Sequence, residues 1–165
     1  MVSKSKILGR SFLIFVSIGS TKFPFLRITS CLRQLNTDQY KIVQDFTSPD
    51  QFIDFIKKAD KIIIHGGLGT IFLVIKHAKF VPLIIPRISK YKEHVDNHQL
   101  FFSEYLRKKL PDNLKKYFVI DEKIEDVVDN YLKEKNKVNN FNKFLFPNKN
   151  KNILVKKLEE YINSI

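Results

Sequence analysis

Three short apolar runs limit the folds open to this chain more than any other feature. They span residues 12–16, 62–64 and 81–85, and polar residues do not alternate with the apolar ones. Strands with this pattern are covered on both faces, as in the parallel sheets of α/β proteins. We therefore predict a mostly parallel sheet with helices packed on both of its faces.

Helical patterns lie between these runs. Ser48 suits a helix N-cap and Pro49 the first helical position, and apolar residues then recur at helical spacing up to Ala59. Further elements are expected as helices over 70–78, 97–109 and 124–133, and as strands over 40–44 and 117–120. Alternation of strands and helices predicts a doubly wound α/β sheet with right-handed crossovers, in which ligands bind at the carboxyl ends of the strands.

Length and charge narrow the functional classes. The 165 residues suit one domain, on a prior of about 100–200 residues per domain. The net charge of +12 favours an anionic partner such as nucleic acid, a nucleotide sugar or an acidic membrane surface. A single cysteine, Cys31, excludes an internal disulfide framework and a cysteine-rich zinc site, and favours a reducing cytosol.

Neither a membrane span nor a signal peptide is expected. No apolar run reaches the about 18 residues that a spanning helix needs. The run over 12–18 lies at the short edge for a signal peptide and has no small-x-small cleavage site after it. We interpret it as a buried first strand.

The sharpest motif is HGGLGT, from His65 to Thr70, between a predicted strand and a predicted helix. Glycines let the backbone approach a ligand without obstruction by a Cβ, and a helix N-terminus offers unpaired N–H groups and a positive dipole end. The motif predicts a site for a phosphate or diphosphate, with one further hydrogen bond from Thr70. It is neither a P-loop nor a full G-x-G-x-x-G fingerprint, so a glycine-rich turn without a ligand stays open.

Polar residues gather again after the third apolar run, as Pro86-Arg87 and then EHVDNHQ over 93–99. Topology places them beside the glycine motif, where they could bind sugar hydroxyls and phosphate oxygens. His94 and His98, with Asp96 between them, raise the question of a metal site, which would need a third protein ligand and an open position. Without an H-E-x-x-H motif or cysteine ligands we expect no metal; helix capping by Asp96 or Asn97 is the structural alternative.

From about residue 133 the composition shifts towards Lys and Asn. We therefore expect residues 1–135 to form the domain and residues 136–165 to form a solvated linker followed by a short amphipathic helix. No internal repeat is present in the sequence.

Residues 14–23, 59–70 and 86–99 together resemble the C-terminal domain of family 28 glycosyltransferases. More narrowly, they are similar to the small catalytic subunits of two-protein UDP-sugar transferases. These include the eukaryotic subunit that adds the second N-acetylglucosamine to a dolichol-linked chain, and bacterial capsular and exopolysaccharide subunits that add β-1,4-galactose. The third segment is closer to the bacterial exopolysaccharide branch.

The resemblance implies the Rossmann-like donor-binding half of a GT-B transferase. The expected reaction is inverting transfer of a hexose, galactose favoured, from a UDP-sugar to a lipid-diphosphate-linked saccharide at the cytoplasmic membrane face, without a metal or cofactor. The donor-binding residues it implies are Gly66, Gly67, Leu68, Gly69, Thr70, Arg87, Asn97, His98 and Gln99. Gly19, Ser20 and Thr21 are placed at the acceptor cleft, and His94 and His98 are the candidates for an unidentified general base.

Such a transferase needs a donor lobe and an acceptor lobe, each about a domain in size, so we expect a membrane-anchored partner that supplies the acceptor half. The sequence departs from its relatives at Leu73, where many have a glutamate, at Pro24, where an aspartate is usual, and in the short region 35–48. Two alternatives stay open. One is a noncatalytic paralogue of the subunit; the other is a basic nucleic-acid-binding module, although the chain has no recognisable binding motif and its lysines are spread widely.

Overall fold

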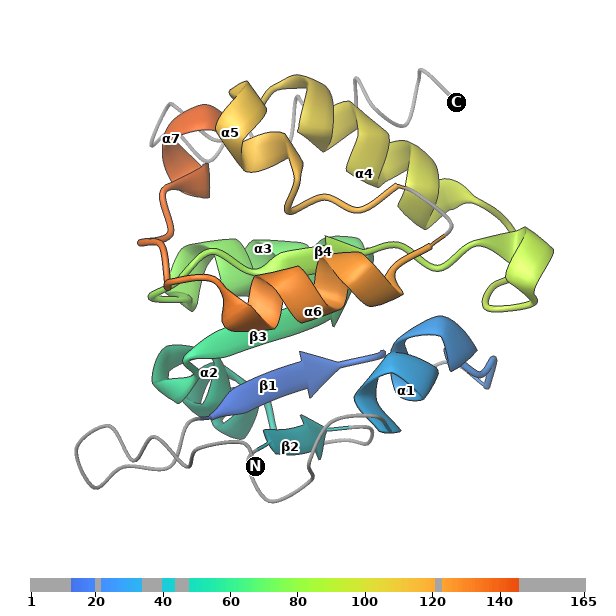
Figure 1. Ribbon diagram of the computed structural model, residues 1–165, viewed down its shortest axis with the longest axis horizontal. Helices are drawn as coiled ribbons and strands as arrows, with labels where there is room; N and C mark the ends of the chain where they lie inside the picture. Colours follow the sequence, from blue (N-terminus) through green and yellow to red (C-terminus); the bar gives the residue numbers. More distant parts are fainter. Residues whose placement is uncertain (1–12, 20–21, 34–39, 44–47, 121–122, 146–165) are drawn as a thin grey trace.

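The core of the protein is a four-stranded parallel sheet, seen in a computed structural model that describes residues 13–19, 22–33, 40–43, 48–120 and 123–145 (Figure 1). The strands are β1 (Ile14–Ser17), β2 (Tyr40–Val43), β3 (Lys61–His65) and β4 (Leu83–Ile85), in the spatial order β2-β1-β3-β4. All pairs are parallel, with Ile14 opposite both Tyr40 and Lys61. The predicted doubly wound α/β sheet is confirmed.

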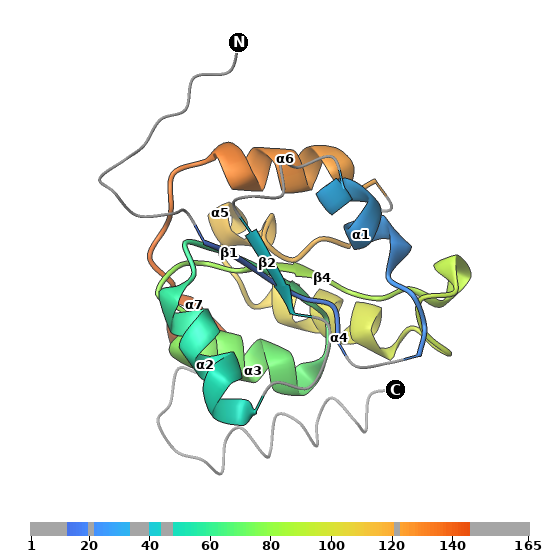
Figure 2. The same ribbon diagram turned by 90° about the horizontal axis from the view of Figure 1, so that it is seen from below.

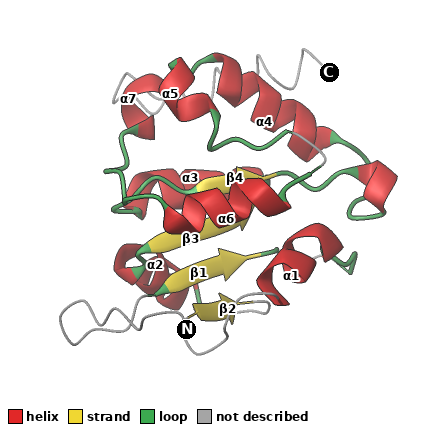
Figure 3. Ribbon diagram, in the orientation of Figure 1, coloured by secondary structure: helices red, strands yellow, loops and turns green. Residues whose placement is uncertain are grey.

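Helices cover both faces of this sheet. They are α1 (Leu26–Arg33), α2 (Pro49–Lys58), α3 (Leu68–His77), α4 (His98–Lys108), α5 (Asp112–Lys115), α6 (Glu125–Lys133) and α7 (Phe141–Leu145), with a 3-10 turn over Ser89–Tyr91. Figure 2 shows α1 and α6 over one face and α2 and α3 over the other. Strands and helices alternate along the chain from β1 to β4 (Figure 3).

Helix α2 begins where its capping residues predict. The Ser48 hydroxyl accepts a hydrogen bond from the backbone N–H of Gln51, and Pro49 occupies the first turn, where its missing N–H costs nothing. Aromatic rings dock this helix on the sheet: the ring of Phe15 in β1 lies 5.3 Å from that of Phe52 and 6.0 Å from that of Phe55. The apolar spacing along 52–59 is therefore the face that α2 buries.

Helix α6 is fixed to the opposite face by a buried tyrosine. The hydroxyl of Tyr131 accepts from the backbone N–H of Ile62 at 3.0 Å and donates to the carbonyl of Val81 at 2.9 Å. One side chain thus satisfies backbone groups of two neighbouring segments that the sheet itself leaves unpaired.

The segment over 117–120 is a single bridge rather than the expected strand. Only Phe118 pairs with β4, through hydrogen bonds of Tyr117 and Val119 with Ile84. Because β4 has just three residues, it offers little edge for a longer pairing. Strand β2 is described over Tyr40–Val43, and the last residue of the expected strand, Gln44, lies outside the described residues.

The chain after residue 135 packs on the domain as far as residue 145, instead of running as a solvated linker. The carbonyl of Lys137 accepts from the Val81 N–H, and Phe141 is fully buried. The Asn139 amide donates to the carbonyls of Ile75 and Ala78 at the end of α3. This asparagine therefore caps a helix, a role that its Lys/Asn-rich surroundings did not suggest. The predicted C-terminal helix lies outside the described residues.

None of the helices in the described ranges has both the length and the apolarity of a membrane span.

Candidate functional site

The candidate site lies where the two central strands end. The chain leaves β1 towards β2 and β3 towards β4, in opposite directions across the sheet. In doubly wound sheets a ligand crevice forms outside the carboxyl ends of the strands at such a switch point. Ser17 pairs with Ile64 at this edge, so the turn through Gly19 and the turn through Gly66 and Gly67 lie beside one another.

The surroundings of the three glycines of the HGGLGT motif differ. A Cβ on Gly66 would lie 2.9 Å from Pro86 Cα, and one on Gly67 would lie 2.3 Å from His65 Nε2. At Gly66 the conflict is with backbone, and at Gly67 it is with the His65 ring, so a larger residue at either position would displace part of the protein. A Cβ on Gly69 would meet nothing within 4 Å, so Gly69 borders open space.

Helix α3 presents its N-terminus at this turn. Gly67 is the N-cap, and no described side chain caps the helix. The N–H of Ile71 is the first to bond within the helix, to the Gly67 carbonyl, which leaves the N–H groups of Leu68, Gly69 and Thr70 for a ligand. These groups and the helix dipole are what an anion site at a helix N-terminus requires; binding of a phosphate or diphosphate here stays a prediction.

His65, the last residue of β3, fills the space between the two turns. Its ring lies against the backbone of Gly67 and of Gly19, whose φ of +79° favours glycine. Nδ1 donates to the Ser17 carbonyl at 3.4 Å. Burial lowers the pKa of His65 to about 4, outweighing the opposite effect of that hydrogen bond, so the ring is neutral near pH 7.

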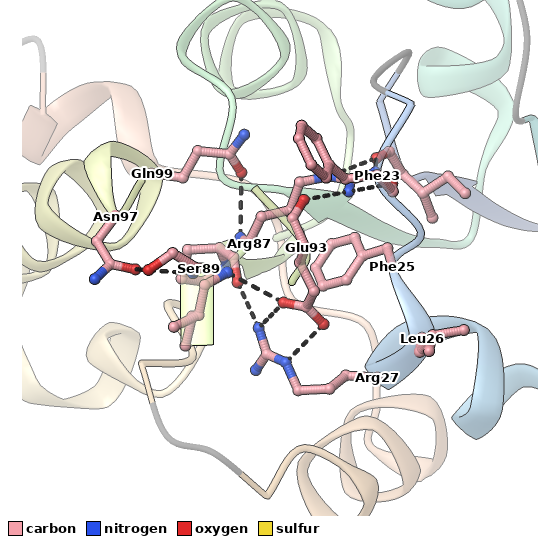
Figure 4. Close-up of polar contacts among 12 residues, drawn as sticks. Phe23, Phe25, Leu26, Arg27, Arg87, Ser89, Glu93, Asn97 and Gln99 are labelled. Carbon is pink, nitrogen blue, oxygen red and sulfur yellow. Dashed lines mark hydrogen bonds and ion pairs between the residues drawn. The ribbon is translucent and has the colours of Figure 1, made fainter. Parts of the chain in front are cut away.

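Arg87, just after β4, is 1% exposed and binds backbone rather than facing open space. Its guanidinium donates to the carbonyls of Ile18, Phe23 and Glu93 and lies 4.8 Å above the ring of Phe25 (Figure 4). Burial lowers its pKa from the usual arginine value. Arg87 therefore joins the loop after β1 to the loop after β4; the expected contact with the donor stays a prediction.

Glu93 is the second buried link between these loops. Its carboxylate accepts from Arg27 Nε at 2.9 Å and Nη2 at 2.7 Å, and from the backbone N–H of Ile88 (Figure 4). Arg27 also donates to the Pro86 carbonyl and lies 4.8 Å from the ring of Tyr91. The bidentate pair ties the start of α1 to the β4–α4 loop.

The expected sugar-binding residues lie at the start of α4, and two of their amide oxygens are already engaged. Asn97 Oδ1 accepts from the backbone N–H and hydroxyl of Ser89, and Gln99 Oε1 accepts from the backbone N–H of Arg87 (Figure 4). The Asn97 and Gln99 side chains thus shape the β4–α4 loop, and donor contacts would fall to their amide NH2 groups. The side chain of His98 is 48% exposed.

His94, Asp96 and His98 form one cluster beside this loop. Asp96 Oδ1 accepts from the backbone N–H of His98, the first residue of α4, and also contacts Nδ1 of the His98 ring, whereas the N-cap residue Asn97 makes no side-chain cap hydrogen bond. The backbone hydrogen bond is the main cause that lowers the pKa of Asp96. The His94 and His98 rings lie 4.5 Å apart, edge to face.

The structure thus brings together the glycine turn, Arg87 and the residues over 93–99, as topology predicted, with Gly19 beside them. Ser20 and Thr21 lie outside the described residues. Sequence reasoning missed the roles of His65, Glu93 and Arg27. Of these three residues, only Glu93 could have been found from the sequence. It lies in the run over 93–99, which topology places at the site, and an acidic residue needs a cationic partner if it is buried.

A parallel α/β sheet with a helix N-terminus at its switch point defines a domain of the Rossmann-like class. Residues 4–156 match the glycosyltransferase family 28 C-terminal domain. The chain belongs to this family, and glycosyl transfer is the class of reaction that membership supports. No curated protein and no solved structure gives a match.

Proposed function

We propose that the chain is the donor-binding, catalytic subunit of a transferase that moves a hexose, galactose favoured, from a UDP-sugar to a lipid-diphosphate-linked saccharide. The observation that carries the proposal is the uncapped N-terminus of α3 at the switch point, with open space at Gly69 and the residues of α4 beside it. A diphosphate on this helix would place the attached sugar within reach of the neighbouring loop.

The same geometry suits the chemistry of transfer. When the glycosidic bond to the diphosphate breaks, negative charge grows on the departing UDP. The N–H groups at the start of α3 are fixed donors that oppose this charge without rearrangement. The base that deprotonates the acceptor hydroxyl is unassigned; His94 and His98 are the candidates in the described residues.

The acceptor half is proposed to come from a membrane-anchored partner. The described residues build one sheet with one switch point, which accounts for a donor lobe. Transfer would then take place at the cytoplasmic membrane face, in polysaccharide or glycolipid-precursor synthesis.

A substitution at Gly69 tests the donor site without disturbing the fold. We expect Gly69→Asp to weaken UDP binding at least about tenfold, because the carboxylate meets the diphosphate while its Cβ meets no protein atom. An acidic residue in the first turn of a helix is itself mildly favourable, so the melting temperature should not fall. The measurement is calorimetric titration with UDP and UDP-galactose.

Gly69→Ala is the matched control and should bind UDP within about threefold of the parent chain, since it adds a methyl group but no charge. Equal UDP affinity in Gly69→Asp and the parent chain would show that the diphosphate does not bind at this turn. Donor binding without transfer, in the presence of the coexpressed partner, would favour the noncatalytic paralogue.

A further inference from the structure

Two histidine rings converge on one carboxylate beside the proposed donor site. The Nδ1 atoms of His94 and His98 both lie next to Asp96 Oδ1, His94 at 3.3 Å. One ligand atom from each residue can be chosen so that all three lie within 4.8 Å of one another. Two imidazoles and one carboxylate are the ligand types of a zinc site.

The Nδ1 atom of His94 gives a second reason to expect a metal ion at this cluster. Its Nδ1 is buried, and no group in the described part of the chain hydrogen-bonds to it, although Asp96 Oδ1 is only 3.3 Å away. A buried ring nitrogen without a hydrogen bond is uncommon and calls for a partner. Two atoms that bind one cation tetrahedrally at about 2.0–2.1 Å lie about 3.3–3.4 Å apart, which matches this pair.

The cluster is also held in place and open to solvent. Asp96 is fixed by its hydrogen bond to the His98 backbone N–H, and the His94 ring packs 6.1 Å from the ring of Phe23. The side chains of Asp96 and His98 are 58% and 48% exposed, so a cation can enter and keep water on its remaining positions. The nearby carboxylate of Glu93 is occupied by Arg27 and is not a fourth ligand.

We propose that His94, Asp96 and His98 bind a transition-metal dication, with Zn²⁺ preferred, and that this ion inhibits the enzyme. Nitrogen ligands select Zn²⁺ over Mg²⁺ and Ca²⁺, which prefer oxygen. The inhibitory part rests on the proposed function, because it assigns His98 to both the ion and the donor sugar. Zn²⁺ on His98 withdraws that side chain from the sugar, so the ion and the UDP-sugar compete.

Titration of the metal-free full-length chain with ZnCl2 tests the site. We expect one Zn²⁺ per chain, no comparable binding of Mg²⁺, and a loss of affinity of at least about tenfold in Asp96→Asn and His94→Asn. Asparagine at position 96 can still accept the His98 N–H, so the start of α4 is kept. His77→Asn is the matched control, because His77 lies at the end of α3, outside the cluster, and it should leave zinc affinity unchanged.

Equal zinc affinity in Asp96→Asn, His94→Asn and the parent chain would overturn the proposal, as would the absence of stoichiometric binding in the parent chain. The inhibitory step has its own readout: added Zn²⁺ should weaken UDP-galactose binding in the parent chain and not in His94→Asn. If UDP-galactose fails to bind even with EDTA present, the proposed function fails, whereas the zinc site is judged by the titration alone.

Discussion

At the scale of single residues, several residues of the candidate site are constrained by contacts inside the protein, whether or not a ligand is bound. Gly66 and Gly67 are glycines because Pro86 and His65 occupy the space of a Cβ. The sequence predicted that the glycines of this motif allow close approach of a ligand, and that prediction is untested at Gly66, Gly67 and Gly69. A glycine motif cannot separate the two reasons, since both need the same missing atom.

His65 makes the stability of the protein depend on pH. Its pKa in the folded protein is about 4, below the ordinary histidine value of 6.5, because burial opposes the charged ring. The unfolded chain therefore takes up a proton first as the pH falls. The free energy of unfolding should decline from pH 6.5 downwards, by about 3 kcal/mol once the pH is below 4.

The measurement is urea denaturation of the parent chain and of His65→Gln at pH 7, 5.5 and 4.5. The variant is expected to be less stable at pH 7 because the ring no longer fills the space between Gly19 and Gly67. Its loss of stability between pH 7 and 4.5 should nevertheless be smaller than that of the parent chain. Parallel declines would show that His65 does not titrate as inferred.

At the scale of elements, sequence patterns predicted the helix starts and strands that depend on residues close together in the chain. The capped start of α2 and the buried strands follow from residues near one another in the chain. The segment over 117–120 and the packed chain over 134–145 could not be predicted in this way. Their structure depends on which edge and which helix end lie nearby, as the cap of α3 by Asn139 illustrates.

The side-chain contacts that join elements at the site could likewise not be predicted from the sequence. Arg27 and Glu93 are 66 residues apart, and only the fold brings α1 against the β4–α4 loop. The Glu93 carboxylate is fully buried and paired in two hydrogen bonds with Arg27, whose side chain is 10% exposed. Glu93→Gln should therefore destabilise the protein by about 3 kcal/mol, because it leaves a largely buried guanidinium without its counter-charge.

Asp54→Asn provides the control for the Glu93 prediction. It removes an ion pair between exposed side chains, with Lys58 one turn along α2, and should cost about 0.5 kcal/mol or less. Thermal denaturation of both variants checks the contrast. Similar small losses in the two would mean that the Arg27–Glu93 pair does not hold the loops together.

At the scale of the whole molecule, the candidate site does not account for the net charge of +12. A diphosphate bound at α3 would use only a small part of it, and Arg87 is buried against carbonyl oxygens. The remaining charge is available for an extended anionic surface, at about 1 kcal/mol for each Lys or Arg that lies close to anionic lipid.

We therefore expect the full chain to sediment with vesicles that contain phosphatidylserine and not with vesicles of phosphatidylcholine alone. Because the attraction is electrostatic, raising the salt concentration from about 0.05 to 0.5 M should release it, as the Debye length shortens. UDP at saturation should leave this binding unchanged, since the proposed donor turn would hold the diphosphate with backbone N–H groups rather than with lysines. Binding that is independent of lipid charge, or retained at high salt, would contradict a role for the net charge at a membrane face. Release by UDP would instead place the lipid phosphates at the N-terminus of α3.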